Sequence, residues 1–239
     1  MKRTIIISLI LLFSLSFRLE AQKVYLVAVG VSDYPGSVND LKLPAQDAKA
    51  IYRLYKTNTN STAVLLINSA ANKGRILREM RNLFNKARSG DIVVLFLSCH
   101  GYKGGFYVYD DYLRYDEIRS VFSECVSKNK IIFADACFSG DIREEGSAGT
   151  NHSKDNIMLF LSSRSNEYSI ESPNMKNGFF TACLIRALKG GADFDRNKVI
   201  TAKELFKAVS SSVKNLSSNM QHPVMWGNFS DNMPVMIWK

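Results

Sequence analysis

Ile92-Val93-Val94-Leu95-Phe96-Leu97 and Ile131-Ile132-Phe133-Ala134-Asp135-Ala136 are two stretches of strand length that are almost continuously apolar. Alternating apolar and polar side chains would indicate a strand with one face in water, whereas a continuous apolar run predicts a strand covered on both faces. Such strands are typical of a mainly parallel sheet between two layers of helices. We therefore expect an α/β fold whose sheet contains both runs.

The rest of the chain alternates in the same way between strand-like and helix-like segments. Three further apolar runs are Val24–Val31, Ala63–Ile67 and Ile157–Leu161. Five segments have apolar residues on one face of a helix: Ala45–Lys56, Lys73–Arg88, Tyr115–Val126, Phe179–Leu188 and Ala202–Val213. The last is preceded by Thr201-Ala202-Lys203-Glu204, which is typical of a capping box. The pattern predicts one doubly wound α/β domain, because no repeat or Pro-rich linker marks a boundary.

The amino-acid composition excludes several classes of protein, and its one unusual feature is the high positive net charge. The 239 residues are 46% hydrophobic, which excludes a disordered, collagen-like or disulfide-stapled chain. The net charge of +9 points loosely toward nucleic acid, anionic surfaces or acidic ligands. We expect no nucleic-acid binding, because the sequence has no basic helix and no strand with interleaved aromatic residues.

Residues 1–21 have the pattern of a secretory signal peptide. Lys2 and Arg3 precede the apolar stretch Ile5–Phe17, and Ala21 offers a small residue for cleavage. The apolar stretch is short of the roughly 20 residues that a membrane span needs, so no stable span is expected after cleavage. We expect a secreted or periplasmic domain of residues 22–239. Retention as an anchor stays open, because Leu19 is not the small residue preferred before the cleavage site.

Side chains that could take part in catalysis follow the two apolar runs quoted at the start, residues 92–97 and 131–136. His100-Gly101 comes soon after residues 92–97, and Cys137 directly follows residues 131–136. Ligands of parallel sheets bind at the carboxyl ends of the strands, so neighbouring strands would bring His100 and Cys137 to one edge. An imidazole beside a thiol activates it as a nucleophile, and the backbone N–H of Gly101 could serve an oxyanion hole. The alternatives are a buried structural cysteine and a core histidine.

Two motifs carry a resemblance to a known family. Ser98-Cys99-His100-Gly101 and Asp135-Ala136-Cys137-Phe138-Ser139-Gly140 resemble the His-Gly and Asp-x-Cys-x-Ser-Gly motifs of caspase-like cysteine peptidases, in particular metacaspases and their bacterial relatives. Softer similarity occurs in Val29–Tyr34, Leu43–Ala48 and Asn177–Leu184. The resemblance implies a three-layer α/β/α caspase-like fold, protein or peptide substrates, Cys137 as nucleophile and His100 as acid and base. This sequence departs from the metacaspase pattern at Phe138, where metacaspases usually have His.

The resemblance also implies a preference for basic substrates. Metacaspases carry Asp at the position of Asp135 and cut after Arg or Lys, whereas animal caspases have Gln there and bind an acidic side chain. Asp47 matches a second acidic position of that pocket, although it could equally be a first-turn helix acid that complements the helix dipole. Arg143 and Lys154 lie in the Gly- and Ser-rich segment after Cys137, which suggests self-cleavage.

Cofactors are not required by the sequence, and calcium is the weakest of the expectations. Asp193–Glu204 places oxygen-bearing side chains at several positions of a calcium-loop template, but Lys198 stands where the template needs Gly. Glu204 is already explained by the capping box. The four cysteines have no metal spacing; Cys99, Cys125 and Cys183 lie in apolar segments, as expected for buried free thiols, and a bridge stays open.

The sequence therefore predicts a secreted cysteine endopeptidase that cuts after Arg or Lys. Its site would comprise His100, Cys137, Gly101, Asp135 and Asp47. The alternative is an inactive caspase-like domain that binds a protein or an anionic surface through its basic charge. Nothing in the sequence indicates an oligomeric state.

Overall fold

The computed structural model describes residues 22–136, 156–164 and 175–238, and these form a six-stranded central sheet with the order β10-β8-β7-β3-β1-β2. The strands are β1 (Val24–Gly30), β2 (Ser61–Ile67), β3 (Ile92–Ser98), β7 (Asn129–Asp135), β8 (Ile157–Leu161) and β10 (Val224–Trp226). The pairs from β2 through β8 are parallel, and only β10 is antiparallel to its neighbour. The prediction of a mainly parallel sheet is confirmed.

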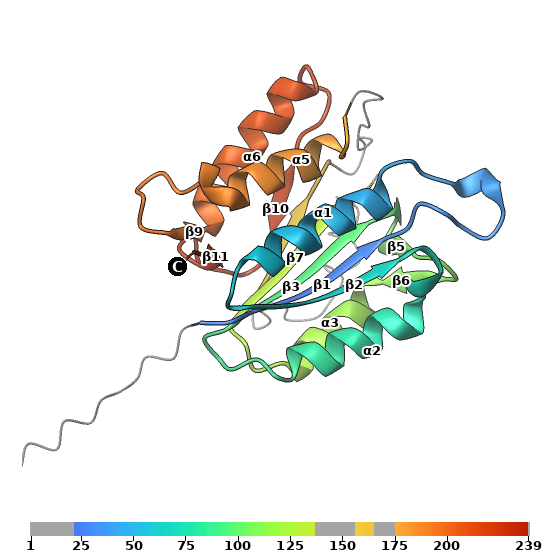
Figure 1. The fold of residues 1–239 in the computed structure, drawn as a ribbon, viewed down its shortest axis with the longest axis horizontal. Coiled ribbons are helices and arrows are strands. Elements are labelled where there is room, and N and C mark those ends of the chain that lie inside the picture. The colour runs from blue at the N-terminus through green and yellow to red at the C-terminus, as the bar shows by residue number, and fades with distance from the viewer. Residues whose placement is uncertain (1–21, 137–155, 165–174, 239) are drawn as a thin grey trace, which may run out of the picture.

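Helices cover both faces of the sheet, as Figure 1 shows. One face is covered by α1 (Pro44–Thr57), α5 (Phe179–Arg186) and α6 (Ala202–Leu216), and the other by α2 (Lys73–Phe84) and α3 (Tyr115–Glu124). The two layers of helices therefore enclose two separate apolar clusters, one on each side of the sheet. This is the predicted three-layer α/β/α arrangement.

The continuous apolar runs are explained by burial on both faces. In β3 every residue is buried; Val93, Leu95 and Leu97 face the α2–α3 side, whereas Val94 and Phe96 face the α1–α5–α6 side. Successive side chains of a strand point to opposite faces, so a strand between two helical layers has no position for a polar residue in its interior.

Three predicted helices are longer than the observed ones. Helix α3 ends at Glu124 instead of Val126. Helix α2 ends at Phe84 instead of Arg88, because the backbone tightens into short turns in which Lys86 N–H donates to Leu83 O and Ala87 N–H to Phe84 O. Helix α5 ends at Arg186 and continues as a π-turn, η5 (Ala187–Gly191), that closes with Gly190 at a φ of 107°.

Several short elements have no sequence pattern that would predict them. They are the 3₁₀ turns η1 (Ser37–Asn39) and η2 (Asn68–Ala70), the three-stranded sheet of β4 (His100–Tyr102), β5 (Gly105–Tyr107) and β6 (Tyr112–Arg114), and the pair β9 (Val199–Thr201) and β11 (Pro234–Ile237). Three or four residues are too few to show a period of two, so tertiary pairing alone defines these strands.

The strand register aligns the carboxyl ends of three strands. Gly30 of β1 pairs with Ser98 of β3, and Ser98 pairs with Asp135 of β7. Residues that follow these three positions therefore emerge at one edge of the sheet.

Within the part of the chain that the structure describes, none of the helices combines the length and the apolar composition needed to cross a bilayer.

Candidate active site

Strands β3 and β7 are neighbours, joined by the crossover helix α3. Ser98 and Asp135 are paired, so His100 and residue 137 each follow the aligned end of their strand by two residues. The strand arrangement on which the predicted Cys-His pairing depended is therefore present. Cys137 itself lies outside the described residues, which end at Ala136 on this strand.

The end of β7 is held in place by two buried polar residues that sequence reasoning missed. Ala136 N–H donates to Ser162 Oγ at 3.2 Å, and the same hydroxyl group donates to Ala136 O at 3.1 Å. Gln221 Nε2 donates to Ser162 O at 2.9 Å, and neither Ser162 nor Gln221 is exposed to solvent. The backbone just before position 137 is thus fixed by hydrogen bonds inside the protein. The only sign of this role in the sequence is that Ser162 directly follows the apolar run Ile157–Leu161.

His100 is oriented by residues of the segment between β1 and α1, far from it in the sequence. Its Nε2 lies 2.9 Å from the carbonyl oxygen of Asn39, and its backbone N–H donates to Tyr34 Oη at 3.2 Å. Tyr34 Oη in turn donates to Tyr107 O at 2.9 Å, and the rings of Tyr34 and His100 are 5.3 Å apart. A carbonyl can only accept, so the contact with Asn39 requires the hydrogen on Nε2 and leaves Nδ1 as the proton acceptor.

Tyr34 stays a hydrogen-bond donor because its hydroxyl is strongly protected from ionisation. Burial is the largest cause that raises its pKa, and the neighbouring Cys99 adds to it. The hydroxyl therefore keeps its proton and its bond to Tyr107 at every physiological pH. Tyr34 ends the segment Val29–Tyr34 that resembles the family, but the sequence alone predicts no role for it.

Gly101 follows His100 within β4 and is paired with Phe106 of β5. It is half-buried, next to the histidine whose strand it shares. This places its backbone at the same sheet edge as the ends of β3 and β7. Its role as an oxyanion donor stays a prediction.

Asp47 is buried and accepts hydrogen bonds from three residues in two other parts of the fold. Its Oδ1 accepts from Asn177 Nδ2 at 2.8 Å and from Gly178 N–H at 3.2 Å, and its Oδ2 accepts from Ser98 Oγ at 3.1 Å. The residue is in the first turn of α1, as the helix-dipole interpretation requires. Its three hydrogen bonds, however, connect α1 to β3 and to the segment that begins α5.

Asp135 meets Asp47 at the start of α5. Asp135 Oδ2 accepts from Thr181 Oγ1 at 2.7 Å and from Thr181 N–H at 3.2 Å. A Cβ atom on Gly178 would lie 2.7 Å from Asp135 Oδ2 and 3.6 Å from Asp47 Oδ2. The two predicted pocket acids therefore converge on a glycine that has no side chain to separate them. Ser98 and Thr181 lie in segments that resemble the family, but the sequence predicts no role for them, because their hydrogen bonds depend on this convergence.

The buried pair of acids is electrostatically strained. Burial raises the pKa of Asp47 well above its usual value, and the nearby charge of Asp135 raises it further, while the three hydrogen bonds oppose the shift. The same Asp135 helps burial to raise the pKa of Cys183 to about 11. Two carboxylates in a site of low dielectric are stabilised by a cation between them.

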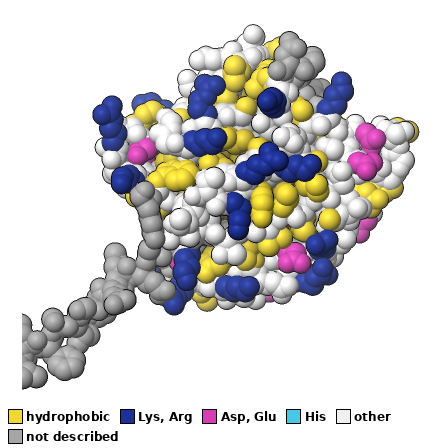
Figure 2. Space-filling model, in the orientation of Figure 1, with side chains coloured by type: hydrophobic (Ala, Val, Ile, Leu, Met, Phe, Trp, Pro, Cys, Tyr) yellow, Lys and Arg dark blue, Asp and Glu magenta, His cyan; other side chains and the backbone are white. Residues whose placement is uncertain are grey.

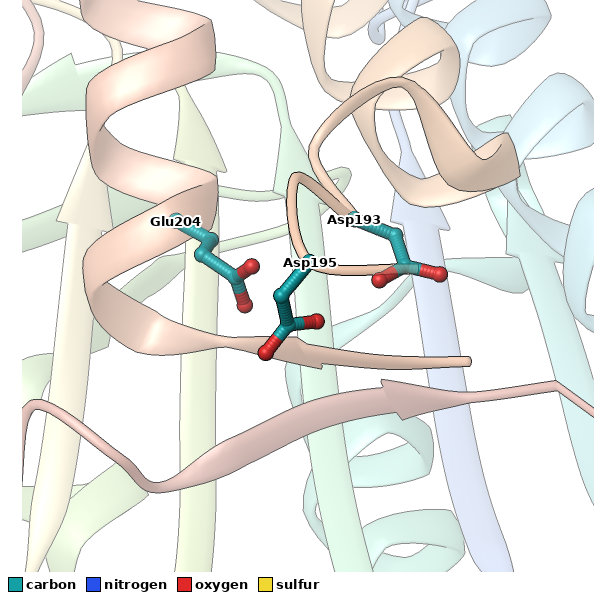
Figure 3. Close-up of side chains that lie close together, drawn as sticks. All are labelled: Asp193, Asp195 and Glu204. Atoms are coloured by element: carbon teal, nitrogen blue, oxygen red, sulfur yellow. The ribbon is translucent and has the colours of Figure 1, made fainter. Parts of the chain in front are cut away.

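The calcium-loop candidate forms a cluster of three acids at the N-terminal end of α6 (Figure 3). Single oxygens of Asp193, Asp195 and Glu204 lie within 4.8 Å of one another. Lys198 has a φ of 67°, so it adopts the backbone that the template reserves for Gly. All three carboxylates already accept hydrogen bonds from the loop: Asp193 from Asn197 and Lys198 N–H, Asp195 from Asn197, and Glu204 from Phe194 N–H and Thr201. Calcium binding stays a prediction.

The described cysteines behave as the sequence predicted. Cys99, Cys125 and Cys183 are buried and free, which excludes a bridge among these three. Burial raises the pKa of each thiol, so all three are protonated and unreactive at neutral pH.

Comparison with known proteins gives the family. The caspase-domain family model matches residues 23–233. A crystal structure of a Geobacter sulfurreducens protein superposes with a TM-score of 0.68 at 16% identity, covering 91% of this chain and 100% of the other. Caspase-1 of Spodoptera frugiperda gives a TM-score of 0.66 at 14% identity, covering 91% and 90%. Identities this low show the fold alone, and no curated protein sequence matches. Since the family model spans nearly the whole described domain, the chain belongs to the caspase-domain family.

Proposed function

We propose that this protein is an exported cysteine endopeptidase that hydrolyses peptide bonds after Arg or Lys. A caspase domain supports a cysteine-protease type of function. The observation that carries the finer proposal is the convergence of Asp47 and Asp135 on Gly178, at the same sheet edge as His100. A substrate guanidinium or ammonium group entering between these acids would neutralise them, whereas a substrate carboxylate would add a third negative charge.

The catalytic step follows from the orientation of His100. Its Nδ1 would accept the proton of the Cys137 thiol, and the thiolate would attack the carbonyl carbon of the scissile bond. Backbone N–H groups of Gly101 and Cys137 would stabilise the oxyanion. The protonated His100 would then donate its proton to the leaving amine, and water would hydrolyse the acyl-enzyme. Asn39 and Tyr34 contribute by holding the imidazole in the required tautomer and position.

A set of matched reporters tests both the activity and its charge preference. The purified mature protein is assayed under reducing conditions, with and without calcium, on peptides that differ only in Arg, citrulline or Asp before the scissile bond. Citrulline has the shape of Arg without its charge, so we expect loss of at least about a hundredfold in kcat/KM relative to Arg, and no cleavage after Asp. Cys137→Ala should abolish turnover. Equal rates on Arg and citrulline would overturn the charge argument while leaving the peptidase proposal intact.

Variants of the two acids connect the preference to the structure. Asp47→Asn and Asp135→Asn keep the side-chain shape and remove one charge each, so both should lower kcat/KM on the Arg peptide by about ten- to a hundredfold. They should reduce the ratio of Arg to citrulline cleavage in the same proportion. If the ratio stays constant, the acids support the fold and do not bind the substrate cation.

Self-cleavage at Arg143 or Lys154 and export are the two remaining parts of the proposal. Both basic residues and the signal segment lie outside the described residues. Recombinant wild-type protein should separate into two fragments that Cys137→Ala protein lacks, and the double variant Arg143→Gln/Lys154→Gln should stay intact. N-terminal sequencing of the exported protein should begin at Gln22. A fully active protein that remains a single band would exclude self-cleavage as a requirement.

A further inference from the structure

Strand β2 is the outermost strand of the central sheet and is paired only with β1 within the described residues. Its seven residues extend over about 23 Å at the usual rise of a strand. Proteins usually protect such an edge with a charged residue, a proline, a bulge or a short strand. Residues Thr62–Ile67 contain no charged residue and no proline, and the register with β1 is regular throughout.

The backbone groups that point away from β1 can be identified from one hydrogen bond. Val24 N–H donates to Asn60 O at 3.0 Å, so the backbone of Asn60 faces β1. N–H and C=O groups alternate sides along a strand, and therefore those of Ala63, Leu65 and Ile67 face outward. These three residues offer three donors and three acceptors to a further strand.

Helix α1 lies above this edge and turns a basic flank toward it. Asp47 contacts β3 and the start of α5, so its side of α1 faces the middle of the sheet. At 100° per residue, Lys49, Tyr52 and Lys56 lie on the opposite flank, above β2. Tyr52 packs on the same apolar cluster as Ala63, Leu65 and Ile67.

Figure 2 shows the result on the surface: a hydrophobic stripe at the edge of the sheet between groups of Lys and Arg side chains over α1 and α2. Within the described residues, Lys49, Arg53 and Lys56 of α1 form no ion pair. Helix α2 adds Arg75 on its exposed surface. Its one acid, Glu79, lies 3.8 Å from the guanidinium group of Arg78, which offsets its charge.

We propose that the edge of β2 binds an extended acidic segment of a partner protein by strand addition. The backbone of Ala63, Leu65 and Ile67 would supply the hydrogen bonds, and Lys49 and Lys56 would attract acidic side chains that alternate along the added strand. A second copy of this chain fits the surface poorly. A twofold pairing of β2 with β2 would bring the basic flanks of both α1 helices together, and like charges facing each other oppose association.

The test uses the mature wild-type protein and fluorescent ten-residue peptides that alternate Glu with Thr or Val. These peptides contain no Arg or Lys, so they are not substrates of the proposed peptidase and their binding is measured by anisotropy without any hydrolysis. We expect saturable binding of the Glu peptide that weakens as salt rises from about 50 mM to about 500 mM. The matched peptide with Gln in place of Glu should bind at least about tenfold more weakly.

Two pairs of variants locate the site on β2. Lys49→Glu/Lys56→Glu should weaken binding of the Glu peptide by about tenfold or more, whereas Lys189→Glu/Lys214→Glu, with the same net charge but at the other end of the sheet, should not. Ala63→Pro removes an outward donor without touching the pairing with β1, so it should weaken binding, while Ala63→Val should not.

Three results would overturn the proposal: equal binding of the Glu and Gln peptides, equal effects of the two charge-reversal variants, or a stable dimer at low salt that Ala63→Pro dissociates. The last result would identify a second copy as the occupant. Because the readout is binding and not hydrolysis, failure here leaves the peptidase proposal untouched, and an inactive enzyme would leave the docking proposal untouched.

Discussion

At residue 178 the absence of a side chain allows two buried acids to approach each other. The backbone of Gly178 has a φ of −55° and a ψ of 154°, which any residue can adopt, so glycine is needed there for space and not for conformation. A Cβ atom would lie 2.7 Å from Asp135 Oδ2, closer than packed atoms tolerate. Glycine at position 178 therefore leaves the space in which Asp135 and Asp47 form the proposed specificity pocket.

Gly178→Ala should therefore lower stability by about 1–3 kcal/mol, as overpacking of a filled site does. It should also lower kcat/KM on Arg peptides by more than on citrulline peptides, because the Cβ atom displaces Asp135. The matched control is Gly74→Ala in α2, where the nearest atom, Asn72 Oδ1, is 3.8 Å away. That variant should be neutral or more stable by up to about 1 kcal/mol. Urea unfolding of both proteins checks the comparison, and equal stabilities would contradict it.

Helix α6 shows at the scale of an element how one acid can satisfy two sequence patterns. Glu204 Oε2 accepts from Thr201 N–H at 3.0 Å and from Thr201 Oγ1 at 2.7 Å, and Thr201 Oγ1 accepts from Glu204 N–H at 3.3 Å. The capping box predicted from the sequence is confirmed. The same carboxylate is also part of the cluster of Asp193, Asp195 and Glu204. A metal ion bound there would compete with Thr201 for the oxygens of Glu204.

If capping is the role of Glu204, Glu204→Ala should cost about 1 kcal/mol, or about 2–4 °C in Tm for a chain of this size. Glu204→Gln should retain most of that stability, because Gln also closes a capping box. Thermal unfolding with and without calcium chloride separates the two roles. A rise in the Tm of the wild type with calcium that Glu204→Gln lacks would instead identify a metal site.

The stability of the whole protein should depend on pH, because Asp47 and Asp135 are buried close to each other. The pKa of Asp47 is raised in the folded state, so the native protein holds a proton that the unfolded chain releases. Stability is therefore lost as pH rises from the ordinary Asp pKa of about 4 to the raised value, by about 1.4 kcal/mol for each pH unit between the two. In the proposed peptidase, a substrate cation bound between Asp47 and Asp135 would offset this cost.

Asp47→Asn removes that titration while its amide keeps the hydrogen-bonding shape. The variant should gain stability relative to the wild type as pH rises from 4 to 8, although it loses affinity for Arg substrates. Urea unfolding at both pH values measures the difference. A difference in stability that is the same at pH 4 and pH 8 would mean that the Asp47 carboxylate is not strained in the ligand-free protein.

The order of strands and helices could be predicted because its signal is local. Five continuous apolar runs matched five strands of the central sheet, and five amphipathic segments matched five helices, since burial on both faces or on one face imposes a period that any short window contains. Helix ends were less predictable: α2 stops four residues early because its last turn tightens, and there the carbonyl oxygens of Phe84 and Lys86 accept hydrogen bonds from Cys125 and Tyr25, which are distant in the sequence.

The sequence by itself determined the sheet, the layers around it and the two strand exits at which His100 and Cys137 stand, because apolar periodicity and a short motif are local properties. Only the tertiary structure decided which distant groups meet there. Asn177 reaches Asp47 across 130 positions, and Asn39 reaches His100 across 61. Such contacts leave no periodic trace in the sequence, because they depend on strand order, register and helix packing acting together. The same holds for β2, whose sequence predicts a strand but not that its outer edge is unpaired in the described fold beside a basic helix.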